Sequence, residues 1–214
     1  MTIELLNIDC MEYMKDIPDN YFDLAIVDPP YGIERFKKAS GSTRFKGHEG
    51  MQKKGLEWDI KPNQQYFYEL HRVSKHQIIW GANNFDLPAT EYFCIWDKQQ
   101  TVDNFATAEY AYVSQSLKKP AKIFKYSIHQ HNADHLKQGK IHPTQKPIKL
   151  YEWLLTNYAK KGQKILDTHL GSGSSAIAAH YFGVDFVGCE LDTDYFNASQ
   201  KRFEESTKQT TLFD

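Results

Sequence analysis

Ile165-Leu166-Asp167-Thr168-His169-Leu170-Gly171-Ser172-Gly173-Ser174-Ser175-Ala176 is the stretch from which the fold of this chain can be predicted. A short apolar run enters a Gly-x-Gly-x-x-Ala turn, and an alanine-rich segment follows. Glycines let a backbone turn tightly and lie against a ligand. This order predicts a strand over 164–167, a ligand-binding turn, and a helix over 174–181.

An acidic residue ends the next predicted strand, which covers 185–190. Glu190 follows the glycines by about twenty residues, where a carboxylate can accept both hydroxyls of a ribose. A P-loop is excluded because no lysine follows the glycines. A dinucleotide needs two mononucleotide halves, and the sequence stops soon after Glu190. We therefore expect S-adenosyl-L-methionine, which has one ribose and no phosphates, and we expect earlier strands to complete the sheet.

Further strands are predicted over 23–27, 77–80, 92–96 and 108–113, from short apolar or alternating runs. Apolar residues recur at helical spacing over 64–73 and 147–158. Strands that alternate with helices indicate an α/β fold with a parallel, doubly wound, Rossmann-like sheet. We expect one domain over 1–214, with a basic loop insert at about 32–56 and an irregular insert at about 114–141.

The amino-acid composition is that of a globular protein. Hydrophobic residues make up 41% and charged residues 25% of the 214 residues, which excludes a wholly disordered chain. No apolar stretch is long enough for a membrane helix, and the first residues do not resemble a signal peptide. The three cysteines are widely spaced, which argues against a disulfide framework or a cysteine zinc site and favours a reducing cytosol.

The net charge of −1 hides an uneven distribution. Residues 35–54 hold seven Lys or Arg against one acid, and residues 118–149 hold eight Lys against one acid. Two basic segments on an acidic body are typical of a protein that meets a polyanion on one face. The alternative is that both segments are ordinary solvated loops.

Asp28-Pro29-Pro30-Tyr31 follows the strand predicted over 23–27, at the end where open α/β sheets bind ligands. The Asp28 carboxylate and the Pro29 carbonyl can accept the two N–H groups of an exocyclic amine and aim its lone pair at a methyl sulfonium. Pro30 stiffens the turn, and Tyr31 offers a flat face on which a base extruded from a duplex can stack. The methyl transfer is then an in-line displacement that depends on alignment. The alternative is an ordinary strand-ending turn.

These motifs together resemble the β-class amino-methyltransferases of DNA, in which Asp-Pro-Pro-Tyr precedes the cofactor glycine loop. The resemblance also covers Asn7-Ile8-Asp9-Cys10 and His142-Pro143-Thr144-Gln145-Lys146-Pro147, and it spans nearly the whole chain. It implies that Asp9 and Cys10 hold the adenine of the cofactor. It further implies that segment 142–147 and the glycine loop flank its methionine portion.

The residues that we expect to contact the cofactor are Asp9, Cys10, Asp28, His142, Thr144, Gln145, Lys146, Asp167, Gly171, Ser172, Gly173, Ser174 and Glu190. The glycine loop departs from the usual Asp-Pro-Phe-x-Gly-Ser-Gly-Thr of the family. Thr168 replaces the proline, His169 the phenylalanine and Ser174 the threonine. The phenylalanine normally packs near the cofactor, so its loss alters affinity, whereas the serine retains the hydroxyl.

The acid at position 28 favours adenine N6 as the methylated atom, because family members that act on cytosine N4 more often carry serine there. A C5-cytosine mechanism needs a Pro-Cys nucleophile, and no proline precedes any of the three cysteines. The alternatives are cytosine N4, an RNA base or a protein glutamine amine, and a non-catalytic nucleic-acid-binding subunit of the same fold. A dehydrogenase is disfavoured by the order of the motifs.

Double-stranded DNA is the expected partner, because both basic segments adjoin the motifs at 28–31 and 142–147. The resemblance places a short target-recognition region at 114–141, so limited sequence specificity is expected. The residues that we expect to contact DNA are Arg35, Lys37, Lys38, Arg44, Lys46, Lys118, Lys119, Lys122 and Lys125.

Segment 209–213, Gln-Thr-Thr-Leu-Phe, resembles the peptide by which bacterial replication proteins bind the sliding clamp; the alternative is a frayed tail. His129, His131 and His135 have no fourth ligand nearby in the sequence, so we predict loop histidines and no metal. The family resemblance suggests a homodimer and a cytoplasmic enzyme of bacterial or phage origin, with no membrane partner.

Overall fold

The computed structural model describes residues 1–32, 59–103 and 105–208. Within these residues an eight-stranded sheet has the order β1-β8-β7-β2-β3-β5-β4-β6. The strands are β1 (Ile3–Asn7), β2 (Leu24–Val27), β3 (Gln77–Trp80), β4 (Phe93–Asp97), β5 (Ala108–Val113), β6 (Lys122–Lys125), β7 (Lys164–Asp167) and β8 (Asp185–Glu190).

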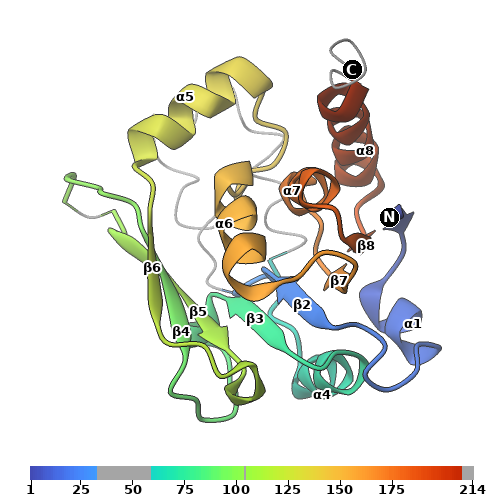
Figure 1. The fold of residues 1–214 in the computed structure, drawn as a ribbon. Helices are drawn as coiled ribbons and strands as arrows, with labels where there is room; N and C mark the ends of the chain where they lie inside the picture. Colours follow the sequence, from blue (N-terminus) through green and yellow to red (C-terminus); the bar gives the residue numbers. More distant parts are fainter. Residues whose placement is uncertain (33–58, 104, 209–214) are drawn as a thin grey trace.

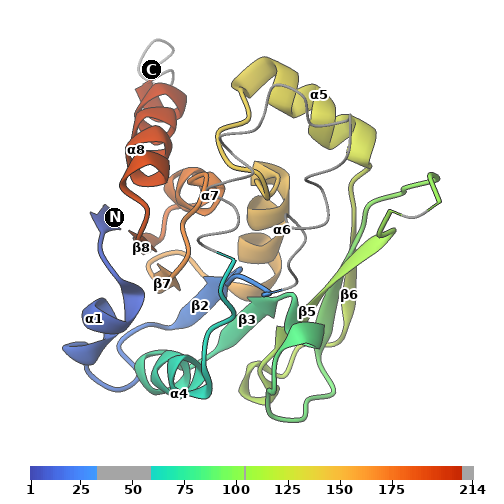
Figure 2. The same cartoon turned by 180° about the vertical axis from the view of Figure 1, so that it is seen from behind.

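Helices cover both faces of the sheet, as Figure 1 and the opposite view in Figure 2 show. One face packs on α1 (Cys10–Lys15) and α4 (Gln64–Val73), and the other on α6 (Ile148–Tyr158), α7 (Ser174–Phe182) and α8 (Thr193–Lys208). The central strands are buried on both sides because their residues alternate between the two cores. In β2, for example, Leu24 and Ile26 pack with α6 and α7, whereas Ala25 and Val27 pack with α1 and α4.

The winding of the chain reverses between β7 and β2. β7, α7 and β8 lead toward β1 at one edge, whereas α4 and β3 follow β2 toward the other edge. β2 and β7 are parallel neighbours, with Leu24 opposite Ile165. Ligands of open α/β sheets bind where the strand order reverses, beyond the carboxyl ends of the strands. The turns that follow β2 and β7 are the two that carry the predicted motifs.

The doubly wound α/β class is confirmed, but the expectation of a parallel sheet is wrong for one strand, β5. β5 runs antiparallel to both of its neighbours, β3 and β4. The reason is that the chain returns from β4 to β5 without a crossover helix between them.

The insert at 114–141 is not irregular, because it contains β6, the short helix η3 (Gln115–Leu117) and α5 (Ile128–Gln138). A capping box between Ser127 and Gln130 starts α5 and was the local signal for it. The histidines at 129, 131 and 135 therefore lie on a helix and not in a loop.

Two predicted features lie outside the described residues: most of the basic loop at 32–56, with Arg35, Lys37, Lys38, Arg44 and Lys46, and the clamp-like segment 209–213. In the described part of the chain, no helix combines the length and the apolar character that a membrane crossing needs.

Candidate active site

The glycine loop connects β7 to α7 through two left-handed residues. Gly171 has φ +53° and Gly173 has φ +72°, a region that residues with a Cβ rarely adopt. A Cβ on Gly173 would also lie 3.3 Å from Ser199 of α8, so the loop packs tightly against that helix. Ser174 then begins α7.

Glu190 lies at the carboxyl end of β8 beside this loop. Its Oε2 accepts a hydrogen bond from the Gly171 N–H at 2.8 Å, and its Oε1 accepts one from the Asp192 N–H at 3.0 Å. Burial raises the pKa of this carboxyl. A carboxylate has about four lone-pair sites, so each oxygen retains capacity for a ligand hydroxyl.

A cavity of about 400 Å³ opens at the carboxyl ends of the strands. Its size is that of a site for a small molecule or cofactor. It brings together eleven of the residues predicted from sequence: Asp9, Cys10, Asp28, Pro30, His142, Thr144, Gln145, Lys146, Gly171, Ser172 and Glu190. The two predicted motifs therefore meet at one site, as neighbouring strand ends require.

Three other predicted cofactor residues do not line the cavity but contact the loops that form its wall. The carboxylate of Asp167 accepts hydrogen bonds from Ser175 Oγ at 2.6 Å and from the His169 N–H at 3.0 Å. Burial raises the pKa of Asp167 to about 7. The hydroxyl of Ser174 donates to the carbonyl of Lys146 at 2.8 Å, and this bond joins the glycine loop to segment 142–147. Gly173 is the third, through its packing on Ser199.

Asp28 has partners on both carboxylate oxygens. Its Oδ1 accepts from the hydroxyl of Tyr31 and its Oδ2 from the ammonium of Lys146, each at 2.5 Å. From the sequence we predicted that a base stacks on the Tyr31 ring. In the structure the hydroxyl of Tyr31 donates to Asp28, and burial raises the pKa of Tyr31 well above the usual value. The ring lies over Gly81, which has φ +67° and where a Cβ would overlap it.

Lys146 belongs to a chain of four alternating charges that sequence reasoning missed. Its ammonium contacts Glu109 Oε2 at 3.2 Å as well as Asp28, and Glu109 Oε1 pairs with Lys98. Glu109 lies on β5 and Lys98 directly after β4. The two lysines overcome the cost of burial and lower the pKa of Glu109 to about 2. The sequence signal was a carboxylate within an otherwise apolar and aromatic strand.

Arg202 of α8 also went unpredicted. Its guanidinium donates to the carbonyl of Ser172 at 2.7 Å and to the hydroxyl of Ser174 at 3.0 Å. Burial lowers the pKa of Arg202 to about 10, still well above neutrality. A cationic side chain of the C-terminal helix therefore holds the glycine loop from outside.

The basic residues of the second segment do not all flank this site. η3 precedes Lys118 and Lys119, and the hydroxyl of Ser116 in η3 donates to the carbonyl of Lys75, just before β3 begins. Lys118 and Lys119 are exposed at the edge where strands begin, opposite the cavity. β6 runs parallel to β4 from Lys122 to Lys125, so Lys125 lies nearer the cavity edge.

Among the described residues, no group of three or more His, Cys, Asp or Glu side chains could hold a metal ion. His131 is buried and its Nε2 is 2.9 Å from the carbonyl of Gln145. This histidine therefore links α5 to the cavity segment 142–147.

Comparison with known proteins defines the class. Residues 74–201 match the N6/N4 family of DNA methylases, and the chain belongs to this family, whose members depend on S-adenosyl-L-methionine. The protein is therefore a DNA methyltransferase of the N6/N4 family, and the resemblance drawn from the sequence is confirmed.

Individual relatives agree with this assignment. Type II methyltransferase M2.MboI of Moraxella bovis is 25% identical over 249 residues, covering 93% of this chain and 86% of that protein. The cytosine-N4-specific PvuII DNA methyltransferase has a similar fold with TM-score 0.62 and 14% identity, covering 97% and 91% of the two chains. The M1.HpyAVI–SAM complex superposes with TM-score 0.55 and 21% identity, covering 94% and 100%.

Proposed function

We propose that this protein transfers a methyl group from S-adenosyl-L-methionine to the N6 amine of adenine in double-stranded DNA. One observation carries the proposal: Asp28 lines the same cavity as Glu190 and the glycine loop. An acceptor for an amine and an acceptor for a ribose thus face one space. The bound cofactor supplies an electrophilic methyl group on a sulfonium centre.

The residues around the cavity fit such a cofactor. Glu190 retains lone pairs for ribose hydroxyls, and Asp9 caps α1, its Oδ1 accepting from the Met11 N–H at 2.7 Å. Burial raises the pKa of the Cys10 thiol to about 12, so Cys10 is a neutral, apolar part of the wall. The Cys10 thiol is therefore not a thiolate that could react with the cofactor.

We assign the substrate side to Asp28, which lines the cavity, and to Pro29, which directly follows it and is buried. The carboxylate of Asp28 and the carbonyl of Pro29 accept the two N–H groups of the amine and leave its lone pair directed at the methyl group. The ammonium of Lys146 lies 2.5 Å from Asp28 Oδ2 and places a positive charge beside this carboxylate. The enzyme thus contributes orientation and fixed charge.

Adenine is proposed because the motif begins with an acid, as it does in family members that act on N6. Cytosine N4 is the second candidate, because the cytosine-N4-specific PvuII enzyme has a similar fold. The experiment below therefore has to distinguish the two bases. The flipped base enters beside Pro30 and Tyr31. Base flipping precedes methyl transfer, because the target atom of a base stacked within a duplex cannot reach the active site.

The test is transfer of a tritiated methyl group to defined DNA duplexes, followed by digestion and mass analysis of the nucleosides. N6-methyladenine is the expected product, and Asp28→Ala should abolish it while cofactor binding persists. N4-methylcytosine would overturn the choice of base. Cofactor binding without any methylated nucleoside would instead indicate a non-catalytic subunit.

A further inference from the structure

Two buried hydroxyl groups and a half-buried imidazole form a hydrogen-bonded chain that ends in the wall of the cavity. The hydroxyl of Tyr66, on α4, is 2.6 Å from Thr168 Oγ1, which is 2.9 Å from His169 Nδ1. Thr168 and His169 both line the cavity. The His169 ring also packs edge-on against Tyr66, with centroids 5.4 Å apart.

This chain fixes the orientation of the imidazole ring. A neutral imidazole has one N–H donor and one acceptor nitrogen, and the bond at one nitrogen decides the role of the other. When the threonine hydroxyl donates to Nδ1, Nε2 carries the proton and is a donor. When Nδ1–H donates to the threonine, Nε2 is an acceptor. In either case Nε2 is the ring nitrogen left to meet a ligand.

The charge of the ring suits a cationic ligand. Burial lowers the pKa of His169 to about 4, so the ring is neutral at pH 7 despite the opposing effect of Asp9. A neutral ring does not repel a sulfonium. Asp9 and Cys10, which resemble the adenine-holding residues of the family, line the same cavity and act electrostatically on His169 and Tyr66 respectively.

We propose that His169 binds the nucleoside half of the cofactor through Nε2, and that Tyr66 and Thr168 are positioning residues that set its tautomer. The inference rests on the proposed cofactor site. It assigns a function to the Thr168-His169 pair, which replaces the Pro-Phe usual in this loop. Binding at this position then relies on a polar contact in place of an apolar one.

The first test measures binding of S-adenosylhomocysteine by calorimetry. We expect His169→Leu to weaken binding about tenfold, because it removes the hydrogen bond of Nε2 without introducing the phenylalanine that is usual at this position. Thr168→Val and Tyr66→Phe should weaken it about threefold, because the ring remains but its tautomer is no longer set. The control is Tyr158→Phe, which removes a tyrosine hydroxyl bonded to Cys94 Sγ in the other core and should leave affinity unchanged.

The second test needs no variant that could fail to fold. Nitrogen-15 spectra of histidine-labelled wild-type protein should show His169 as a single neutral tautomer, and S-adenosylhomocysteine should shift its Nε2 resonance. Equal affinity of all four variants, or an Nε2 resonance unmoved by bound ligand, would overturn the inference. Wild-type protein that binds no S-adenosylhomocysteine would instead count against the proposed function itself.

Discussion

Asp28 and Glu109 share the ammonium of Lys146. This sharing affects how well Asp28 can accept the substrate amine. If Lys146 were paired with Asp28 alone, its N–H groups would all be drawn to the carboxylate that must accept the substrate amine. Glu109 contacts the same ammonium at 3.2 Å and is itself held by Lys98. We infer that the second carboxylate keeps part of Asp28 open to the amine.

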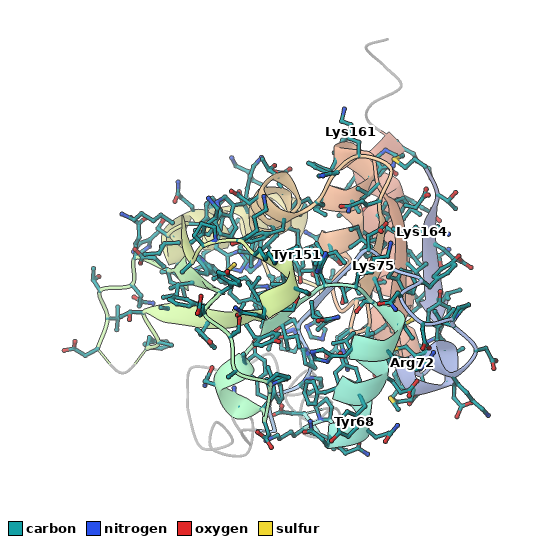
Figure 3. The ribbon with its side chains drawn as sticks, turned by 60° about the horizontal axis from the view of Figure 1, so that its bottom comes forward. Tyr68, Arg72, Lys75, Tyr151, Lys161 and Lys164 are labelled. Carbon is teal, nitrogen blue, oxygen red and sulfur yellow. The ribbon has the colours of Figure 1, made fainter. Side chains whose placement is uncertain are left out.

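Replacing Glu109 with Gln should therefore reduce kcat about tenfold and leave cofactor affinity within about twofold, since Glu109 is not part of the cavity wall described above. Steady-state methyl transfer and calorimetry measure the two quantities. The control is Glu69→Gln, which removes a carboxylate paired with Arg72 on α4; Arg72 is labelled in Figure 3. A kcat equal to that of the control would contradict the role given to Glu109.

Gly81 and Gly162 offer a matched pair of substitutions. Both have positive φ, +67° and +80°, but a Cβ at Gly81 would overlap the Tyr31 ring, whereas a Cβ at Gly162 meets nothing within 4 Å. Each change to alanine should cost about 1–2 kcal/mol in the free energy of unfolding from left-handed strain. Only Gly81→Ala should also lower kcat/KM for DNA, because it displaces Tyr31 from Asp28. Similar kcat/KM values for the two variants would show that the position of Tyr31 does not matter.

At the scale of elements, α8 and α7 hold the glycine loop between them. Ser174 begins α7, and its hydroxyl both donates to Lys146 and accepts from Arg202 of α8. Two segments that are far from the loop in sequence thus determine its position. The loop is therefore held by tertiary contacts as well as by its glycines.

Removal of the Arg202 guanidinium tests this coupling. Arg202→Met should weaken S-adenosylhomocysteine binding about tenfold and lower the free energy of unfolding by about 1–3 kcal/mol, because the Ser172 carbonyl loses its buried donor. Lys201→Met alters the neighbouring residue, whose ammonium is exposed, and should change neither quantity. Calorimetry and urea unfolding provide the two measurements. Loss of stability with unchanged affinity would restrict Arg202 to a structural role.

At the scale of the whole molecule, buried titratable groups at the cavity act in opposite directions on stability. Burial lowers the pKa of His142 to about 3 and of His169 to about 4, and raises that of Asp167 to about 7. Between about pH 6.5 and 4 the unfolded chain binds more protons at both histidines, so acid destabilises the fold. Between about pH 7 and 4 the folded chain binds the proton at Asp167, so acid stabilises it.

Urea unfolding should therefore show a lower stability of the wild-type protein at pH 5 than at pH 7. His142, His169 and His131, whose pKa burial also lowers to about 4, each cost up to about 2 kcal/mol over this interval, and Asp167 offsets about 2 kcal/mol. Asp167→Asn removes the offset, so its stability should fall more steeply by about that amount. Parallel pH dependence of the two proteins would show that Asp167 titrates with an ordinary pKa.

The opposite edge of the sheet has its own charged contact. Asp23 accepts from the ammonium of Lys75 at 2.7 Å and from the Lys164 N–H at 2.9 Å, which joins the starts of β2, β3 and β7; both lysines are labelled in Figure 3. Lys118 and Lys119 lie at this same edge, where the strands begin. The cavity lies at the opposite edge, where the strands end. DNA contacts at Lys118 and Lys119 remain a prediction that the position of these residues does not favour.

The sequence by itself determined the fold class, the two loops and eleven of the residues that line their shared cavity, because each motif is a run of consecutive residues close to the end of a strand. Only the tertiary structure decided the pairing of Lys146 with Asp28 and Glu109, the chain from Tyr66 to His169, and the contact of Arg202 with the glycine loop. Tyr66 and Thr168 are 102 positions apart, and no local periodicity links them. Burial and the pairing of distant charges likewise come from the packing of many segments. The pKa of Asp167, raised by burial, and that of Glu109, lowered by Lys146 and Lys98, are therefore displaced only in the folded chain.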